Sequence, residues 1–221
     1  MKGVTFGDYH SYNNFGLLLD AKHIGAPEVK TTYIDVPGAD GVLDYTEAFG
    51  GIKYGNRQLS FCFGKLAGIA AQIADITTIK NALHGRRLHI TLDDDSGYHY
   101  VGRVSVGDWE SDYENHMIES LTITCDCEPY KYKNAVTTVT RADLTANYKT
   151  LTLTNERRSV VPTITVTEET TLLWGTATYT ISAGTYKLPD IVLTQGSNTL
   201  KAKLTTAASG IITIEYQEAS L

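Results

Sequence analysis

The sequence predicts a mainly β protein with one helix, divided into an N-terminal domain at residues 1–133 and a C-terminal β-sandwich at residues 134–221. Three observations predict this architecture. Many short runs alternate apolar and polar residues, as half-buried strands do. One segment instead repeats apolar residues every three or four positions, which indicates an amphipathic helix. The last ninety or so residues change composition toward threonine, which favours strands.

The N-terminal domain is expected to hold a sheet or barrel. Its clearest strand is Arg57–Phe63, in which Leu59, Phe61 and Phe63 share one face. A tight turn is expected at Pro37–Gly41, where proline fixes φ and two glycines permit positive φ. Other extended segments are expected at 15–36, 88–92, 98–106 and 118–127. Glu128 and Pro129 are expected to end the domain.

The single predicted helix follows that strand. Its apolar stripe consists of Leu66, Ile69, Ile73, Ile76, Ile79 and Leu83. Gly85 is a natural stop, and Lys80 and His84 suit the negative end of the helix dipole. We therefore expect the stripe to pack on the N-terminal sheet, with Ile73 and Ile76 both buried.

The C-terminal domain is rich in threonine, with 15 threonines between Val136 and Ile181. This β-branched residue packs better on a pleated surface than in a helix. Strands are expected at 150–154, 163–167, 176–181, 199–204 and 211–216. Short strands punctuated by turns, without helical periodicity, predict a β-sandwich. Trp174 and Tyr179 are expected to fill its core rather than to stack on a sugar.

Charge is divided unevenly between the domains. Residues 1–133 hold 12 Lys/Arg and 18 Asp/Glu, whereas residues 134–221 hold seven of each. With a pI near 5.5, the chain is poorly suited to gripping phosphates, so we expect no stable nucleic-acid binding. The sequence has no signal peptide and no apolar run of membrane-spanning length, so we expect no membrane insertion. Three cysteines imply no disulfide framework.

Four carboxylates, those of Asp108, Glu110, Asp112 and Glu114, would share one face of a strand. Paired carboxylates are also the machinery of glycosidases. Catalytic carboxylates, however, usually come from separate elements that meet in a cleft. A solvated acidic face is therefore the preferred interpretation.

Other candidate sites have equally simple interpretations. The run Asp93, Asp94, Asp95 is expected to form a turn, because it lacks the ligand spacing of a calcium loop. His89 and His99 would need a further ligand to hold a metal, and Cys125 and Cys127 fit a buried strand face better than a zinc site. We therefore predict no catalytic, cofactor-binding or metal-binding residue, no cofactor, and a protein that is not an enzyme.

Several stretches together resemble the distal tail proteins (Dit) of siphophages and related prophages of Gram-positive bacteria. They are Asp35–Asp44, Gly51–Phe61, Gly85–Leu88, Gly102–Val104, Gly196–Leu200 and Gly210–Glu218. Each motif is moderately specific, and their order and spacing over nearly the whole chain carry the resemblance.

The resemblance implies a virion structural protein, made in the bacterial cytoplasm, whose N-terminal domain closes a homo-hexameric ring at the distal end of a long phage tail. The ring would join the tail tube to the tail tip or baseplate and to receptor-binding proteins, and the C-terminal domain would be galectin-like. It also implies a set of ring-interface residues: Asp35, Pro37, Asp40, Tyr54, Asn56 and Arg57. The second domain has no room for the long arm or inserted carbohydrate-binding modules of some family members.

Two further expectations accompany the ring. Its channel should be negative or neutral so that DNA slides through, and the candidate wall residues are Asp93, Asp94, Asp95, Asp108, Glu110, Asp112 and Glu114. The alternative function is a glycan-binding β-sandwich that acts as an adhesin at the host cell surface. A hexamer in solution would favour the ring, and a monomer that binds cell-wall sugar would favour the adhesin.

Overall fold

A computed structural model describes residues 2–48, 50–66, 69–112, 114–115 and 117–221, without the side chains of residues 66 and 69–71. The chain forms two compact units, Met1–Lys131 with Leu221, and Tyr132–Ser220. The boundary between the units thus follows Lys131, close to the boundary after Lys133 that is predicted from the sequence. No helix among the described residues is both long and apolar enough to cross a lipid bilayer.

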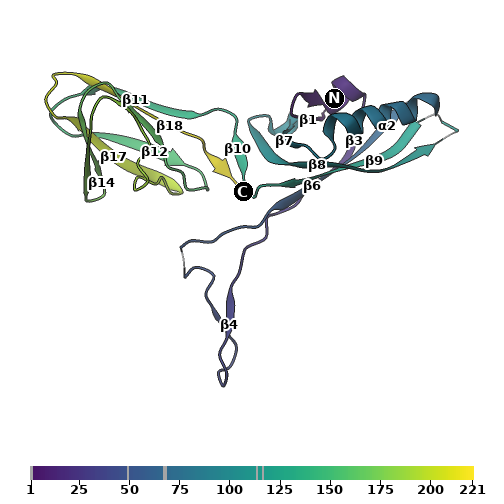
Figure 1. Ribbon diagram of the computed structural model, residues 1–221, viewed down its shortest axis with the longest axis horizontal. Helices are drawn as coiled ribbons and strands as arrows, with labels where there is room; N and C mark the ends of the chain where they lie inside the picture. The colour runs from purple at the N-terminus through teal and green to yellow at the C-terminus, as the bar shows by residue number, and fades with distance from the viewer. Residues whose placement is uncertain (1, 49, 67–68, 113, 116) are drawn as a thin grey trace. The chain divides into compact units, whose positions relative to one another are not determined.

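The first unit is a twisted antiparallel sheet with a helix on one face (Figure 1). Its elements are β1 (Val4–Phe6), β2 (Tyr9–His10), α1 (Ser11–Phe15), β3 (Leu18–Ile24), β4 (Tyr33–Asp35), β5 (Val42–Asp44), β6 (Arg57–Leu66), α2 (Ile69–Leu83), β7 (Arg87–Leu92), the 3-10 turn η1 (Asp93–Asp95), β8 (Tyr98–Asp112) and β9 (Met117–Cys127). The strand order is β2-β1-β7-β8-β9-β6-β3, and β4 and β5 form a separate hairpin. The predicted β-rich fold class is thereby confirmed, with the short helix α1 as an addition.

The core of the first unit lies between this sheet and α2. Phe61 and Phe63 are fully buried as the alternation of β6 predicts, and the Phe6 ring meets Phe61 edge-on with centroids 5.8 Å apart. Cys125 and Cys127 are also fully buried, which confirms that they are core residues. Their burial raises the pKa of both thiols, that of Cys127 to about 12, so both stay protonated.

One part of the helix prediction is wrong. Ile76, Ile79 and Leu83 are buried as expected, but the side chain of Ile73 is 68% exposed. Gln72 takes the inward position one turn before Ile76, and its side-chain amide donates a hydrogen bond to the Met117 carbonyl at 3.2 Å. The inward face thus follows positions 72, 76, 79 and 83, which leaves position 73 turned about 100° away. Leu66 and Ile69 of the predicted stripe lie outside the described side chains.

The second unit is a sandwich of two four-stranded antiparallel sheets. Its elements are β10 (Lys131–Lys133), β11 (Thr137–Leu144), β12 (Lys149–Asn155), β13 (Thr163–Val166), β14 (Thr170–Trp174), β15 (Ala177–Ile181), β16 (Gly184–Tyr186), β17 (Gly196–Leu204), β18 (Gly210–Tyr216) and β19 (Ala219–Ser220). One sheet has the order β11-β18-β13-β16 and the other β12-β17-β14-β15. Trp174 and Tyr179 pack against the core between them, as predicted.

Candidate assembly surface and a hollow in the second unit

The most exposed apolar part of the first unit is the hairpin of β4 and β5. We define the hairpin as residues 28–54, which leave the sheet between β3 and β6 (Figure 1). The exposed large apolar side chains on it are those of Val29, Tyr33, Ile34, Val36, Val42, Leu43 and Tyr45. These seven residues are more than half of the 13 exposed large hydrophobics found among the described residues. Contiguous exposed apolar surface of this kind marks an interaction site.

The register of the hairpin separates its two faces. Ile34 pairs with Leu43, whereas Tyr33 pairs with Asp44 and Asp35 with Val42. Because directly opposed residues point to the same face of a sheet, Ile34 and Leu43 form an apolar face, whereas the other two pairs form a mixed face of two carboxylates and two apolar side chains. A two-stranded hairpin with both faces in water is marginally stable by itself. The apolar face, defined as Ile34 and Leu43, therefore needs a covering partner.

Hydrogen bonds hold the hairpin together along its length. Nearest the sheet, Val29 bridges to Tyr54, and the Lys30 N–H donates to the Lys53 carbonyl at 2.9 Å. Farther out, the Tyr45 N–H donates to the Thr32 carbonyl at 2.8 Å. The turn at Gly38 and Gly41 has φ of 85° and 78°, as predicted for glycine there. The hairpin is thus an ordered element that extends apolar side chains into solvent.

Arg57 anchors the base of the hairpin. It is 7% exposed, and its Nε donates to the Gly25 carbonyl at 2.8 Å while Nη1 donates to the Pro129 carbonyl at 3.3 Å. Its guanidinium lies 5.2 Å from the ring centroid of Tyr100. These contacts show that Arg57 holds the base of the hairpin within the protomer, and its place at the ring interface stays a prediction.

The other residues expected at the ring interface fall into two groups. Asp35, Pro37 and Asp40 are exposed on the hairpin. Tyr54 lies near the base, with its ring edge-on to Tyr130 at a centroid distance of 5.9 Å, and Asn56 is exposed between Tyr54 and Arg57. Asp35, Pro37, Asp40 and Asn56 are therefore exposed in the protomer, where a neighbouring chain can reach them.

The acidic turn η1 connects elements rather than forming a free anionic patch. The Asp93 carboxylate accepts from the Gly3 N–H at 2.7 Å and contacts His10 Nε2 at 3.1 Å. Asp94 is paired with Lys22, and Asp95 with Lys131 at 2.7 Å. Hydrogen bonds from these partners lower the pKa of Asp93 and Asp94 despite some burial. Each carboxylate of the turn is thus bonded to a lysine or histidine side chain from a different segment.

The second acidic stretch follows the alternation of β8 up to the end of that strand at Asp112. The pairing of β8 with β9 shifts register twice: between Val106 and Trp109 the extra residue lies in β8, and between Glu110 and Ser111 it lies in β9. Asp108 and Glu110 are exposed on β8, but Glu114 lies beyond the strand. The Asp112 carboxylate accepts from the N–H groups of Glu114 and Asn115 at 2.9 and 3.0 Å, so it caps the turn that follows.

The two histidines lie on paired strands, as expected, with their rings stacked at a centroid distance of 4.4 Å and an angle of 15°. Stacked rings place their nitrogens in parallel planes instead of aiming them at a common ion. Burial, then the charges of His99 and Arg87, lower the pKa of His89. Across the described residues, we find no group of three His, Cys, Asp or Glu side chains arranged to hold a metal.

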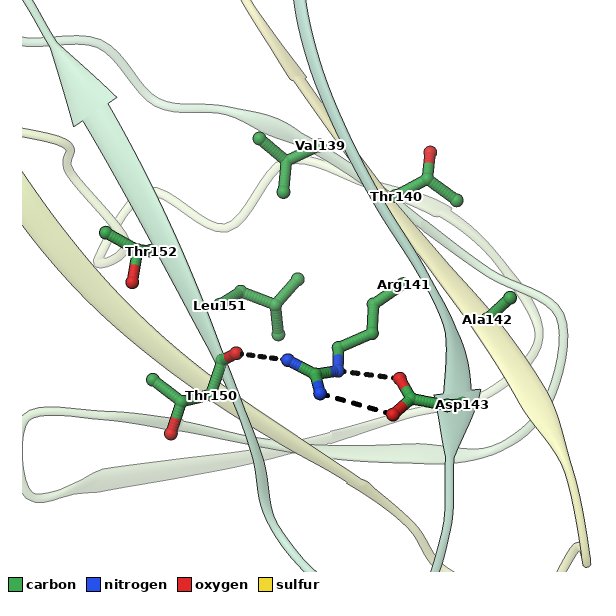
Figure 2. Close-up of a pocket in the computed structure, with 8 residues that line it drawn as sticks. All are labelled: Val139, Thr140, Arg141, Ala142, Asp143, Thr150, Leu151 and Thr152. Atoms are coloured by element: carbon green, nitrogen blue, oxygen red, sulfur yellow. Dashed lines mark hydrogen bonds and ion pairs between the residues drawn. The ribbon is translucent and has the colours of Figure 1, made fainter.

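The second unit has a hollow of about 610 Å³ between the edge strands of its two sheets. It is lined by Val139, Thr140, Arg141, Ala142, Asp143, Thr150, Leu151 and Thr152 (Figure 2). Arg141 spans it from β11: Nε and Nη2 donate to the Asp143 carboxylate at 2.7 and 3.2 Å, and Nη1 donates to the Thr150 carbonyl of β12 at 2.7 Å. The ion pair lowers the pKa of Asp143 and raises that of Arg141.

Sequence reasoning missed both the apolar character of the hairpin and this hollow. Ile34 and Leu43 are separated by nine positions, and their shared face depends on the cross-strand register. Arg141 and Thr150 meet because β11 and β12 end two different sheets, which no local pattern predicts. The placement of Ile34 and Val36 on either side of the charged Asp35 was the one available signal.

Comparison with known proteins gives a likeness in structure. No family model matches the sequence, and no curated protein matches it. Among solved structures, the chain superimposes on the phage SPP1 Dit protein (gp 19.1), described as "a Paradigm of Hub Adsorption Apparatus in Gram-positive Infecting Phages". The TM-score is 0.70 at 16% sequence identity, and the match covers 100% of both chains. The resemblance inferred from the sequence motifs is thus supported over the whole length, and the chain has the fold of a phage distal tail protein.

Proposed function

We propose that this protein is a structural component of a phage tail, and that six copies form a ring at the distal end of the tail. The observation that carries the proposal is the full-length likeness in fold to the SPP1 hub protein. The exposed apolar hairpin supports it independently, because such a surface needs a partner. In a closed ring of identical chains, each chain can cover such a surface on its neighbour.

In this proposal the hairpin is the contact between neighbouring copies. Its apolar face, Ile34 and Leu43, packs on the adjacent subunit. Asp35, Pro37 and Asp40 lie beside that contact, where Asp35 and Asp40 can pair with cations of the neighbour. Arg57 keeps the base of the hairpin fixed in each protomer. A heterologous contact of this kind, repeated by rotation, closes a ring.

The proposed ring connects the tail tube to the tail tip or baseplate and to receptor-binding proteins. The channel wall would be neutral or negative, so that DNA phosphates find no cluster of cations to hold them. Asp93, Asp94 and Asp95 contribute little free charge there, because each is paired. Asp108, Glu110 and Glu114 are exposed and are the better candidates for the wall.

The experiment that tests this function is negative-stain microscopy with mass measurement on a chain truncated after Lys133. The hairpin lies wholly in the first unit, so the truncated chain should still form rings. The intact protein serves as the reference. If the intact protein forms rings and the folded truncated chain is monomeric, the hairpin is insufficient for assembly. If the intact protein forms none at any concentration, the ring proposal is wrong.

A further inference from the structure

The second unit concentrates its positive charge at one corner. Residues 134–221 hold seven Lys/Arg and seven Asp/Glu, and so are neutral as a whole. Four of those cations lie around the hollow and on the neighbouring strand: Arg141, Lys149, Lys201 and Lys203. Among the described residues, Asp143 is the one carboxylate in ion-pair contact with any of the four. We call these four cations the cationic corner, which has a net charge of +3 when Asp143 is included.

Strand register makes the hollow and the lysines continuous. Thr150, which lines the hollow, pairs directly with Lys201 of β17. Directly opposed side chains of antiparallel strands lie about 5 Å apart. Lys201 and Lys203 share the outer face of the sheet, because the alternating residues Leu200, Ala202 and Leu204 are buried. The two lysines are therefore spaced about 6.7 Å apart along the strand.

The free edge of β12 adds a backbone donor to the hollow. The Thr150 carbonyl accepts from Arg141, and the Thr154 carbonyl accepts from the Tyr216 hydroxyl at 2.7 Å. Backbone groups of alternate residues point to the same side of a strand, so the Thr152 N–H also points toward this edge. Unpaired N–H groups at a sheet edge are suited to anions.

Arg141 retains donors for a ligand although it is already bonded. A guanidinium has five N–H groups, and three of them make the bonds to Asp143 and Thr150. The remaining N–H groups of Arg141 and the Thr152 N–H can donate at the hollow. Thr150 and Thr152 add exposed hydroxyls on the outer face of β12 beside Lys201, whereas the Thr140 hydroxyl is already bonded to that of Thr213 at 3.3 Å. Such a set of donors with excess positive charge fits a phosphate group.

We propose that the cationic corner binds an extended polyanion whose charged groups are phosphates. One phosphate occupies the hollow against Arg141 and the Thr152 N–H, and the next phosphates contact Lys201 and Lys203. The side chains around the hollow offer hydroxyls instead of aromatic platforms, and Lys203 Nζ already covers the Tyr148 ring at 4.9 Å. Stacking of bases on aromatic side chains is the usual basis for binding single-stranded nucleic acid. A phosphate polymer without bases is therefore the favoured ligand.

The test uses the intact protein and inorganic polyphosphate, with binding followed by calorimetry over a range of salt concentrations. The Lys201→Gln/Lys203→Gln variant should bind roughly a hundredfold more weakly, at about tenfold for each lost charged contact. The slope of the logarithm of the binding constant against the logarithm of salt concentration should also become shallower by about 0.7 for each lost contact. Lys80→Gln/Lys187→Gln is the matched control, because it removes the same charge at two exposed lysines outside the corner.

Four results would overturn the proposal. Three of them are an absence of polyphosphate binding, equal weakening in the test and control variants, and duplex DNA binding as tightly as polyphosphate, which would assign the corner to nucleic acid. The fourth comes from inorganic phosphate, which separates a single-phosphate site from a polymer site. Weak phosphate binding that requires Arg141 supports the proposal, whereas an affinity equal to that of the polymer contradicts it. Melting temperatures of both variants confirm that they fold.

Discussion

The first unit uses similar apolar residues in two regions with opposite results. On α2, Ile76 and Ile79 are buried against the sheet by the chain itself. On the hairpin, Ile34 and Leu43 are exposed, and each lies in a regular, hydrogen-bonded strand. The side chains in the two regions are therefore similarly apolar, but those of α2 are covered by the sheet of the same protomer and those of the hairpin are exposed. The difference shows that α2 contributes to the core of the protomer, and it supports the proposal that the hairpin contributes to assembly.

The largest effect on stability is expected within the helix. Ile76→Ala should lower the free energy of unfolding by about 2–4 kcal/mol, because it leaves a cavity beneath α2. Ile73→Ala should change it by less than about 0.5 kcal/mol, because the Ile73 side chain is exposed. Urea denaturation of both variants measures the difference. Equal losses would show that the assigned inward face of α2 is incorrect.

A slightly smaller effect is expected at the base of the hairpin. Arg57→Leu removes the donors to the Gly25 and Pro129 carbonyls and should cost about 1.5–3 kcal/mol. Arg57→Lys keeps the charge but loses the planar fork, so it should recover part of that loss at most. Amide hydrogen exchange at Lys30, within the hairpin, should quicken in the Leu variant. If the free energy of unfolding and the exchange rate at Lys30 were both unchanged in the Leu variant, Arg57 would not anchor the hairpin.

Substitutions on the apolar face of the hairpin should leave the stability of the protomer unchanged, in contrast to those at Ile76 and Arg57. The Ile34→Ser/Leu43→Ser variant should melt within error of the wild type when both are dilute enough to be monomeric, because these side chains are exposed in the protomer. Differential scanning fluorimetry across protein concentrations is the measurement. A large loss of stability in the dilute variant would mean that the apolar face packs inside its own chain.

The smallest effect concerns pH. His89 has a pKa lowered in the folded state, so the unfolded chain binds its proton more readily. The stability contributed by neutral His89 is therefore present at neutral pH and declines as pH falls below about 6.5, toward the folded-state value. His89→Asn should flatten the decrease in melting temperature between about pH 7 and 5. An unchanged slope would show that the stacked pair does not control it.

Periodic local patterns predicted most elements of the fold. Alternation located β6 and β9, and a three-to-four spacing located α2, because both reflect burial on one side of a regular element. Ile73 was misplaced because a stripe of isoleucines was wide enough to include an outward position, and because a glutamine, Gln72, occupies the core-facing one. Three strands of the second unit were missed for different reasons: β11 alternates threonine with few large apolar residues, β16 has three residues, and the apolar residues of β14 are consecutive and do not alternate.

The contacts of the candidate site residues could not be predicted from local patterns, because they join distant segments. The acceptors of Arg57 lie 32 and 72 positions away, so no pattern around Arg57 predicts its hydrogen bonds. The alternation of Asp108 and Glu110 was visible in the sequence, but the end of β8 at Asp112, which leaves Glu114 outside the strand, was not. The turn at Asp93–Asp95 showed its charge in the sequence but not its three partners, which lie on separate elements.

The central claim is that the hairpin's apolar face holds copies of this protein together. Light scattering after size-exclusion chromatography tests it most directly, on the intact protein and on the Ile34→Ser/Leu43→Ser variant. Six copies of the 24.2 kDa chain predict a mass of about 145 kDa for the intact protein and 24.2 kDa for the variant. An intact protein that stays at 24.2 kDa, or a variant that keeps the mass of the hexamer, would contradict the account.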